Sequence, residues 1–180
     1  STTPGKVGYD IFANILKGGY QGTLYPVNPA ARSILSMRAY PSVSEIPDAV
    51  DLAIIVLSAD ATLKAVEESA RKGVKGVVIV SAGFREVGKK GLEAENRIVS
   101  ICREAGIRVV GPNCLGVINP LPQVSMNASF SARMPNPGNI SFISQSGALC
   151  TAVLVFAADR GFGFSKFISI GNKADVDESD

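Results

Sequence analysis

Residues 51–57, DLAIIVL, decide the fold class of this chain. They form a continuous apolar run, which is typical of a strand buried on both faces of a parallel sheet. Residues 76–80 (GVVIV) and 107–110 (IRVV) repeat this pattern. Helical patterns over residues 61–71 and 91–105 lie between the runs, so strand, loop and helix recur at intervals of about thirty residues. The sequence therefore predicts a doubly wound α/β domain.

The first residues of the chain have the pattern of a loop that enters a helix. Thr3 is expected as the N-cap and Pro4 as the first helical position, and the helix should end at Gly18-Gly19. In this fold such a loop follows a strand, so we expect the first strand of the domain to lie outside these 180 residues. Residues 24–27 are expected to form the next strand. The apolar face of the first helix comprises Val7, Ile11, Phe12, Ile15 and Leu16.

Right-handed crossovers place the carboxyl ends of parallel strands at one edge of a sheet, where ligands bind. Topology alone therefore predicts that the loops after the strands converge at this edge. These loops are residues 1–6, 27–32, 57–60, 81–85 and 111–114.

Residues 121–138 contain three prolines and show little periodicity, which is typical of a linker between domains. We therefore expect a first domain over 1–120, this linker, and the beginning of a second domain over 139–180. One strand–helix–strand unit cannot close a domain, so the second domain is expected to be incomplete here. Its expected elements are a strand at 140–143, a turn at 144–147, a helix at 148–159 and a strand at 164–170.

The composition argues against several functional classes. Eighteen basic and 16 acidic residues give a net charge of +2, without the basic stripe of a nucleic-acid-binding protein. No apolar run approaches the ~20 residues of a membrane span and no secretory signal is present, so we expect a cytoplasmic protein. The three cysteines form no CxxC pair and histidine is absent. This pattern favours reduced thiols over a structural zinc site.

Two turns that follow predicted strands carry Gly, Ser and Asn: Gly111-Pro112-Asn113-Cys114-Leu115-Gly116 and Ser144-Gln145-Ser146-Gly147. The second opens directly onto a helix, whose N-terminus presents free N–H groups and the positive end of the helix dipole to an anion. Two such turns in adjacent units indicate a protein that handles phosphates or phosphorylated intermediates. Because the chain has no histidine, any imidazole chemistry must come from another part of the enzyme.

The motifs GPNCLGVINP, PGNISFISQSGAL and RGFGFSKFISIGNKADVD, with the opening STTPGKVG, resemble the α region of the nucleoside-diphosphate-forming acyl-CoA synthetases. They are nearer to the acetate-type branch than to the succinate-type branch, and they cover essentially the whole chain. The resemblance implies a Rossmann-like CoA-binding domain followed by the start of a flavodoxin-like α/β domain. It also implies interconversion of acid, CoA and ATP with acyl-CoA, ADP and phosphate, through an acyl phosphate and a phosphohistidine. That histidine lies outside this chain, so no catalytic residue is expected here.

By the same resemblance, coenzyme A lies along the strand ends of the first domain. The loop at residues 1–6 would hold a phosphate, with a plain N-capped helix as the alternative. Arg32 would contact a phosphate or, alternatively, be a solvent-exposed structural arginine. Asn113 would lie near the acyl group. The expected CoA-binding residues are Ser1, Thr2, Thr3, Gly5, Lys6, Val27, Asn28, Pro29, Arg32, Val56, Leu57, Ser58, Val80, Ser81, Ala82 and Asn113.

Ser144, Gln145, Ser146 and Gly147 are expected to bind the phosphoryl group of the phosphohistidine. A GxSxG hydrolase elbow is the competing interpretation, but residue 144 is Ser rather than Gly and no histidine completes a triad. Cys114 lacks a base that could activate it, so we expect local packing rather than nucleophilic catalysis. We expect no metal site, and we interpret Asp175, Asp177 and Glu178 as a solvated acidic end.

The resemblance further implies an ATP-grasp unit, either a separate β subunit or a fused domain, that would hold Mg²⁺ and ATP or ADP. We also expect an oligomer. Two other functions stay open. One is a non-catalytic CoA or acyl-CoA sensor module of a fused protein acetyltransferase. The other is an NAD-binding oxidoreductase domain, which is disfavoured because no Asp or Glu follows residues 24–27, where such a domain carries its ribose ligand.

Overall fold

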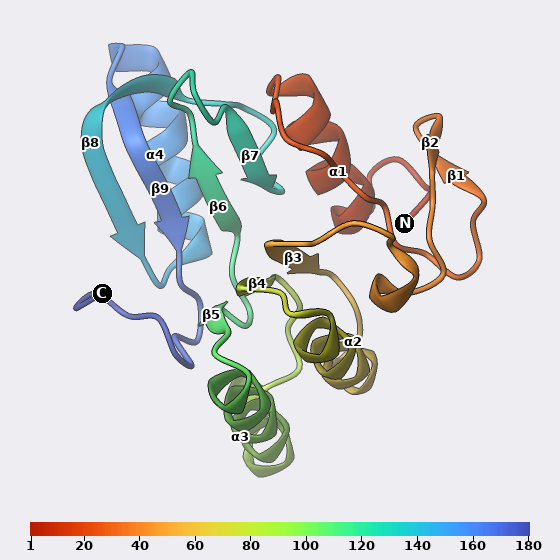
Figure 1. The fold of residues 1–180 in the computed structure, drawn as a ribbon. Coiled ribbons are helices and arrows are strands. Elements are labelled where there is room, and N and C mark those ends of the chain that lie inside the picture. Colours follow the sequence, from red (N-terminus) through yellow and green to blue (C-terminus); the bar gives the residue numbers. More distant parts are fainter.

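The three apolar runs form a parallel sheet, as their pattern predicts. In the computed structural model, which describes residues 1–180, β3 (Leu52–Ile55), β4 (Gly76–Ile79) and β5 (Arg108–Val110) pair in the order β3-β4-β5 (Figure 1). Both pairs are parallel. The predicted α/β architecture with a parallel sheet is confirmed.

Burial differs between the central strand and β3. The side chains of β4 from Val77 to Ile79 are at most 2% exposed, because strands flank β4 on both sides. β3 lies at the edge of the sheet, and its Leu52 is 37% exposed. Leu57 at the other end of the run is also exposed, and only Ile55 is buried. The prediction that residues 51–57 are buried on both faces is therefore wrong for both ends of this run.

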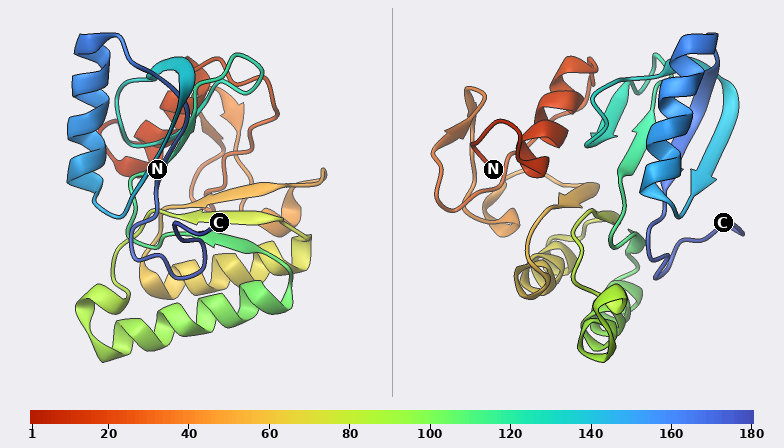
Figure 2. Two further views of the ribbon diagram at one scale, coloured as in Figure 1. Left: turned by 90° about the vertical axis from the view of Figure 1, so that its left-hand side faces the viewer. Right: turned by 180° about the vertical axis from the view of Figure 1, so that it is seen from behind.

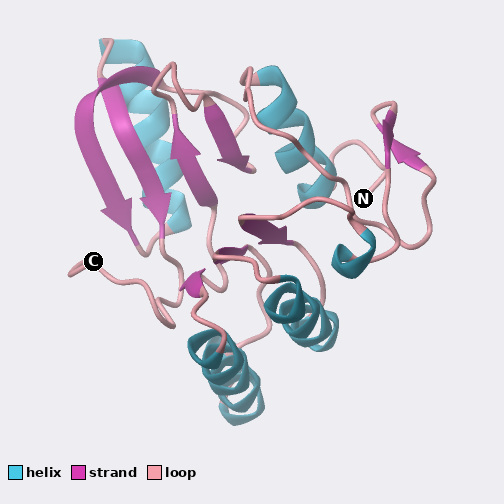
Figure 3. Ribbon diagram, in the orientation of Figure 1, coloured by secondary structure: helices cyan, strands magenta, loops and turns pink.

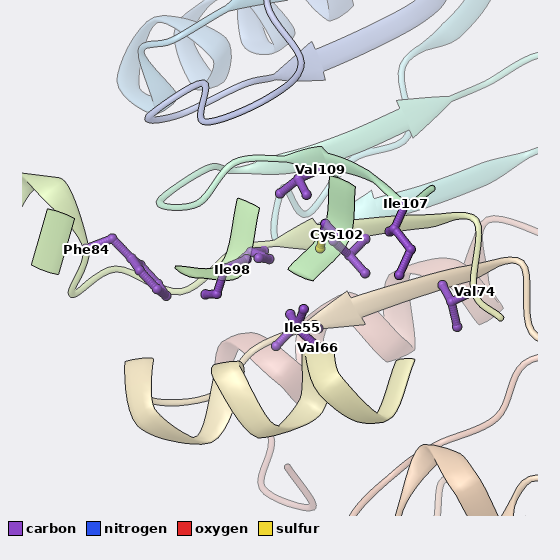
Figure 4. Packing of buried hydrophobic residues seen from close by; sticks show 10 residues of the cluster. Ile55, Val66, Val74, Phe84, Ile98, Cys102, Ile107 and Val109 are labelled. Atoms are coloured by element: carbon purple, nitrogen blue, oxygen red, sulfur yellow. The ribbon is translucent and has the colours of Figure 1, made fainter. Parts of the chain in front are cut away.

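Two amphipathic helices cover one face of this sheet, namely α2 (Ala59–Lys72) and α3 (Lys89–Glu104). Their buried side chains, such as Val66 and Ile98, pack with Ile55 of β3 in the main core cluster (Figure 4). The short helix η2 (Arg85–Val87) leads from β4 into α3. Figure 2 shows α2 and α3 on one side of the sheet, and α1 and the second sheet on the other.

The opposite face of the sheet is covered by α1 (Val7–Lys17), whose Ile11 and Ile15 pack with Val78 of β4. The helix ends before Gly18, as predicted, but its start differs from the prediction. Lys6 is the N-cap and makes no side-chain capping bond. Thr3 as N-cap and Pro4 as first helical residue are wrong, because Gly5 has φ +79°, a left-handed conformation that a right-handed helix cannot contain.

The segment between α1 and β3 is mostly irregular (Figure 3). Residues 24–27 do not form the predicted strand, and Val27 makes only an isolated bridge to Tyr40. A short antiparallel hairpin of β1 (Ser33–Ile34) and β2 (Met37–Arg38), which the sequence did not predict, follows. A 3-10 turn, η1 (Val43–Glu45), precedes β3.

A second, four-stranded sheet has the order β7-β6-β9-β8. The predicted strand–helix–strand unit of residues 139–180 is present in it as β8 (Asn136–Ser144), α4 (Gly147–Arg160) and β9 (Gly163–Ser169). β8 and β9 are parallel, whereas β6 (Gly116–Asn119) is antiparallel to both β9 and β7 (Met126–Ser129).

Residues 121–138 are not a simple linker, which corrects the expectation for that stretch. They contain β7, which pairs with β6, and the first residues of β8. Asn14 of α1 also donates hydrogen bonds to the carbonyls of Ser129 and Ser131 at 2.9 and 2.8 Å. The prolines mark irregular connections, but the stretch packs against the first helix and extends the second sheet.

The end of the chain covers the outer edge of β5. The backbone N–H groups of Asn172, Ala174 and Val176 donate to the carbonyls of Pro112, Gly111 and Val109 at 2.8, 3.0 and 3.1 Å. This antiparallel run of hydrogen bonds ties the residues after β9 to the first sheet. None of the helices is long and apolar enough to cross a lipid bilayer.

Candidate functional site

Ser81 connects the carboxyl ends of all three parallel strands. Its hydroxyl oxygen accepts the backbone N–H of Leu57 at 2.8 Å, and its carbonyl accepts the N–H of Asn113 at 2.9 Å. The loops after β3, β4 and β5 therefore meet at one edge. The convergence that topology predicts is confirmed for these three loops.

A cavity of about 940 Å³ lies beside this edge, along β3. It brings together residues from three separate parts of the chain: the first residue, the turn after residues 24–26, and the end of β3. Six of the residues predicted to bind CoA line it: Ser1, Val27, Asn28, Pro29, Val56 and Leu57.

Residues 1–6 are all exposed, and Ser1 is the one among them that lines this cavity. The Thr3 N–H donates to the Ser1 hydroxyl at 3.2 Å, and the Gly5 N–H donates to the Asp10 carboxylate at 3.1 Å. Lys6 forms no ion pair. Asp10 was not predicted from the sequence, because its bond to Gly5 depends on the left-handed backbone of that glycine.

Gly8 is a second residue that the sequence analysis missed. A Cβ at this position would lie 3.4 Å from the Ser1 nitrogen and 3.6 Å from the Cβ of Val56. Both distances are ordinary van der Waals contacts, so Gly8 marks the place where the first turn of α1 packs against Ser1 and the residue after β3. The spacing Gly5-Lys6-Val7-Gly8 was the only available signal for this role.

The turn at residues 27–29 is held by its own backbone and by Asn28. The Asn28 side chain accepts the Ala30 N–H at 3.0 Å, and its backbone N–H donates to the Tyr40 carbonyl at 2.8 Å. Arg32 is exposed, makes no ion pair and does not line the cavity. The structure therefore places the turn at the cavity and leaves Arg32 outside its lining.

The remaining predicted residues surround this edge without lining the cavity. Ser58 is exposed at the N-terminus of α2, and its hydroxyl makes no capping bond. Val80 is buried, whereas Ala82 is exposed. Asn113 is exposed with φ +57°, and its side-chain amide donates to that of Asn172 at 3.3 Å.

The cysteines are all reduced and buried. Burial raises the pKa of the Cys114 thiol to about 12, and its sulfur contacts the Ile79 carbonyl at 3.3 Å. Such a thiol stays protonated at neutral pH and is a poor nucleophile. The expectation that Cys114 serves local packing is confirmed.

The turn at residues 144–147 is a capped helix start. The Ser146 hydroxyl oxygen accepts the Leu149 N–H at 3.2 Å, and the Ser144 hydroxyl oxygen accepts the Ser146 N–H at 3.1 Å. Gly147 begins α4, and a first-turn N–H has no acceptor inside the helix. In both bonds the serine oxygen is the acceptor, so neither bond uses the hydroxyl proton.

The two sheets meet between this turn and Asn113. The Ile170 N–H donates to the Ser144 carbonyl at 2.9 Å, and two residues further Asn172 contacts Asn113. Gly171 has φ +52°, and a Cβ there would overlap the carbonyl oxygens of Pro112 and Asn113. Residues 170–172 thus connect the carboxyl ends of β5 and β8.

Of the acidic residues near the end of the chain, Asp175, Glu178 and Asp180 form ion pairs, whereas Asp177 accepts hydrogen bonds from Ser179. No group of three metal-binding side chains is present. Asp175 accepts the Val109 N–H at 2.8 Å and the Arg108 guanidinium at 2.9 Å. Glu178 pairs with Lys173 at 2.9 Å. The interpretation as a solvated acidic end is wrong for Asp175, which is hydrogen-bonded to the first sheet.

Two family models match separate parts of the chain. Residues 1–120 match the model of a CoA binding domain. Residues 137–180 match the model of a succinyl-CoA ligase like flavodoxin domain. The resemblance drawn from the motifs, and the Rossmann-like and flavodoxin-like fold class that it implied, are confirmed.

The individual proteins to which the chain is similar include ADP-forming acid–CoA ligases. The chain is 50% identical over its whole length to acetate–CoA ligase [ADP-forming] I of Archaeoglobus fulgidus, and covers 26% of that protein. It is 44% identical to the α subunit of acetate–CoA ligase [ADP-forming] II of Pyrococcus furiosus and covers 38% of it. The acetyl-coenzyme A synthetase 1 of Ca. Korarchaeum cryptofilum, solved with phosphate and ADP, superposes with a TM-score of 0.93. It is 39% identical, and the match covers 99% of this chain and 38% of that one.

Proposed function

Because this chain belongs to the CoA binding domain family, we propose that the strand ends around Ser81 bind coenzyme A. The observation that carries the proposal is the meeting of Ser1, Asn28 and Leu57 at the mouth of one cavity. These residues come from three loops that are far apart in the sequence.

The chemistry of this edge suits a phosphorylated ligand with an apolar arm. Lys6 and Arg32 are cations without ion-pair partners, and Ser58 offers a free hydroxyl at a helix N-terminus. We place phosphates of CoA near residues 1–6 and Arg32, and the adenosine between residues 27–29 and 56–58. The pantetheine arm would then pass residues 80–82 towards Asn113.

We propose that Ser144, Gln145, Ser146 and Gly147 bind a phosphoryl group. The proton of each serine hydroxyl and the free N–H of the first turn of α4 support this role. The backbone connection from Ser144 through Ile170 to Asn172 and Asn113 supports an arrangement in which this turn faces the thiol end of CoA.

For the whole protein we propose an ADP-forming, acetate-type acyl-CoA synthetase. It would interconvert acid, CoA and ATP with acyl-CoA, ADP and phosphate, through an acyl phosphate and a phosphohistidine. No histidine is present in this chain, so that residue belongs elsewhere in the enzyme. The named relatives are ligases, which favours a synthetase over a sensor module.

We further propose an ATP-grasp partner that holds Mg²⁺ and the nucleotide, as a β subunit or a fused domain, within a cytoplasmic oligomer. The α-subunit name of the Pyrococcus furiosus relative supports the first form. Within this chain, residues 1–120 would form the CoA-binding domain and residues 139–180 the start of the ligase domain.

Calorimetric titration with CoA, dephospho-CoA and NAD tests the proposal. We expect CoA to bind, dephospho-CoA to bind more weakly because it lacks one phosphate, and NAD not to bind. Lys6→Ala should weaken CoA binding several-fold, whereas Lys64→Ala, an exposed lysine on α2, should leave it unchanged. Binding of NAD without a response to CoA would contradict the assignment.

A further inference from the structure

The side-chain amide of Asn172 is hydrogen-bonded at both ends. Its nitrogen donates to the carboxylate of Glu86 at 2.7 Å and to that of Glu95 at 2.9 Å. Its oxygen accepts the side-chain N–H of Asn113 at 3.3 Å. We propose that Asn172 is a positioning residue for CoA, which orients the Asn113 amide so that the Asn113 oxygen can accept an N–H of the pantetheine arm. This inference rests on the proposed CoA site and adds a residue to it.

The two glutamates decide which end of the Asn172 amide points to Asn113. An ionised carboxylate only accepts hydrogen bonds, so it binds the NH2 end of an amide and repels the oxygen. Glu95 pairs with Arg85. Burial opposes ionisation of Glu86, but its hydrogen bonds hold the pKa below the ordinary value. Both carboxylates are therefore ionised at neutral pH, and the oxygen of Asn172 must point to Asn113.

The orientation of Asn113 follows from that of Asn172. Because Asn172 offers an oxygen, Asn113 must present its NH2 end, and this leaves its own side-chain oxygen without a partner in the protein. Asn113 is exposed, and its backbone N–H donates to the Ser81 carbonyl at the edge where we place the arm. The pantetheine arm carries secondary amides, each with an N–H that suits this oxygen. An amide that is already oriented loses less conformational freedom when it binds.

The positioning residue belongs to the second sheet. Asn172 lies in the loop after β9, outside residues 1–120 that match the CoA binding domain. Its N–H donates to the Pro112 carbonyl at 2.8 Å, which holds it beside the end of β5. On its other side, the Ile170 N–H donates to the Ser144 carbonyl at 2.9 Å. The end of the CoA site that would bind the arm therefore depends on both parts of the chain.

A double-mutant cycle on the full chain tests whether Asn172 acts through Asn113. Calorimetry measures CoA affinity for the parent, Asn113→Ala, Asn172→Ala and the double variant. We expect each single substitution to weaken CoA binding about fivefold, the effect of one hydrogen bond. The double variant should bind CoA no more weakly than Asn113→Ala does. Unchanged CoA affinity in Asn172→Ala, or two effects that multiply in the double variant, would overturn the proposal.

A second ligand, adenosine 3′,5′-bisphosphate, separates positioning from a general loss of structure. It carries the nucleotide end of CoA and lacks the pantetheine arm. We expect Asn172→Ala to change its affinity by less than about twofold. A loss as large as that for CoA would overturn the proposal, because it would show that Asn172 only stabilises the fold. The matched control is Asn139→Ala, an exposed asparagine on β8, which should leave both affinities unchanged.

NMR relaxation of the Asn113 side-chain amide tests the orientation without any ligand. We expect its order parameter to fall in Asn172→Ala and to stay at the parent value in Asn139→Ala. An unchanged order parameter in Asn172→Ala would overturn the positioning role. A parent chain that orders Asn113 through Asn172 but binds neither ligand would instead refute the proposed CoA site, and this inference with it. The two failures are therefore distinguishable.

Discussion

The side-chain amide of Asn172 donates to the carboxylate of Glu95 at 2.9 Å, although 77 positions separate the two residues in sequence. Glu95 is 1% exposed and also pairs with Arg85, and Asn172 reaches Glu86 at 2.7 Å. One side chain from the loop after β9 thus completes a buried polar cluster beside α3. The second sheet is held to the first by this cluster and by the backbone bonds along β5.

Removal of Glu95 should destabilise the protein strongly. Glu95→Ala leaves the Arg85 guanidinium without its acceptor and removes one of the two carboxylates to which Asn172 donates. We expect a loss of about 2–3 kcal/mol in the free energy of unfolding, because Arg85 is partly exposed and can rehydrate. Urea denaturation measures the change. Glu93→Ala, an exposed glutamate on the same helix, should change stability by less than about 0.5 kcal/mol. Equal effects would mean that the cluster contributes nothing.

Acid should release the end of the chain from β5. Burial opposes ionisation of Glu86, but hydrogen bonds from Asn172 and from the N–H groups of Gly83 and Phe84 hold its pKa below the ordinary value. Hydrogen bonds from Arg108 and the Asp177 N–H also lower the pKa of Asp180. A carboxyl whose pKa is lowered by folding stabilises the fold above its unfolded pKa, near ~4, and loses this contribution as pH falls through the folded value.

The measurement is amide protection of Ala174 and Val176, whose N–H groups donate to β5 and to the residue after it. Their protection factors should fall between about pH 5 and pH 3, while that of Val78 in central β4 persists. Constant protection of Ala174 and Val176 over this range would show that the carboxylates do not hold the segment.

Glycine is required at position 171 by both conformation and space. Its φ is +52°, and an added Cβ would overlap two carbonyl oxygens. Gly161 also has a positive φ, +74°, but a Cβ there meets nothing within 4 Å. Gly161→Ala should therefore cost about 1 kcal/mol, from the backbone alone, and Gly171→Ala about 3 kcal/mol or more. Thermal unfolding of the two variants gives the comparison, and similar melting temperatures would contradict the close packing of residue 171.

Ser146 has a structural role that can be separated from its proposed role in phosphate binding. Ser146→Ala removes the cap of α4 and should cost about 1 kcal/mol. Ser146→Asp retains a capping acceptor, so the free energy of unfolding should stay near that of the parent chain. Its negative charge should nevertheless weaken binding of inorganic phosphate, measured by calorimetry. A stable aspartate variant with undiminished phosphate binding would remove Ser146 from the proposed site.

The sequence predicted those elements whose signal is local. The runs at 76–80 and 107–110 and the helices at 61–71 and 91–105 have strong apolar periodicity, and all four are present within a few residues. Residues 24–27 carry a similar short apolar pattern but form no ladder. A strand needs a neighbour, and this segment makes only the bridge from Val27 to Tyr40, while it and β3 both line the cavity.

The wrong and missed predictions depend on backbone conformation or on contacts between distant residues, which local sequence patterns do not show. Proline and threonine at the start of α1 matched a capping pattern, but the left-handed Gly5 moves the helix start to Val7. At the candidate site, topology predicted the meeting of Leu57, Ser81 and Asn113. The contact between Asn172 and Glu95 has no local signature, because each residue type is ordinary in its own segment and only the fold brings them together.

The backbone bonds between β5 and residues 172–176 have a consequence for biosynthesis. Val109 and Asp175 are 66 positions apart, so the outer edge of β5 leaves the ribosome long before the segment that covers it. At about 5–20 residues per second, the delay is roughly 3 to 13 seconds. During this interval the nascent sheet exposes unpaired backbone groups on β5 to other chains. Correct assembly of the first sheet is therefore completed only when the last part of this sequence has been translated.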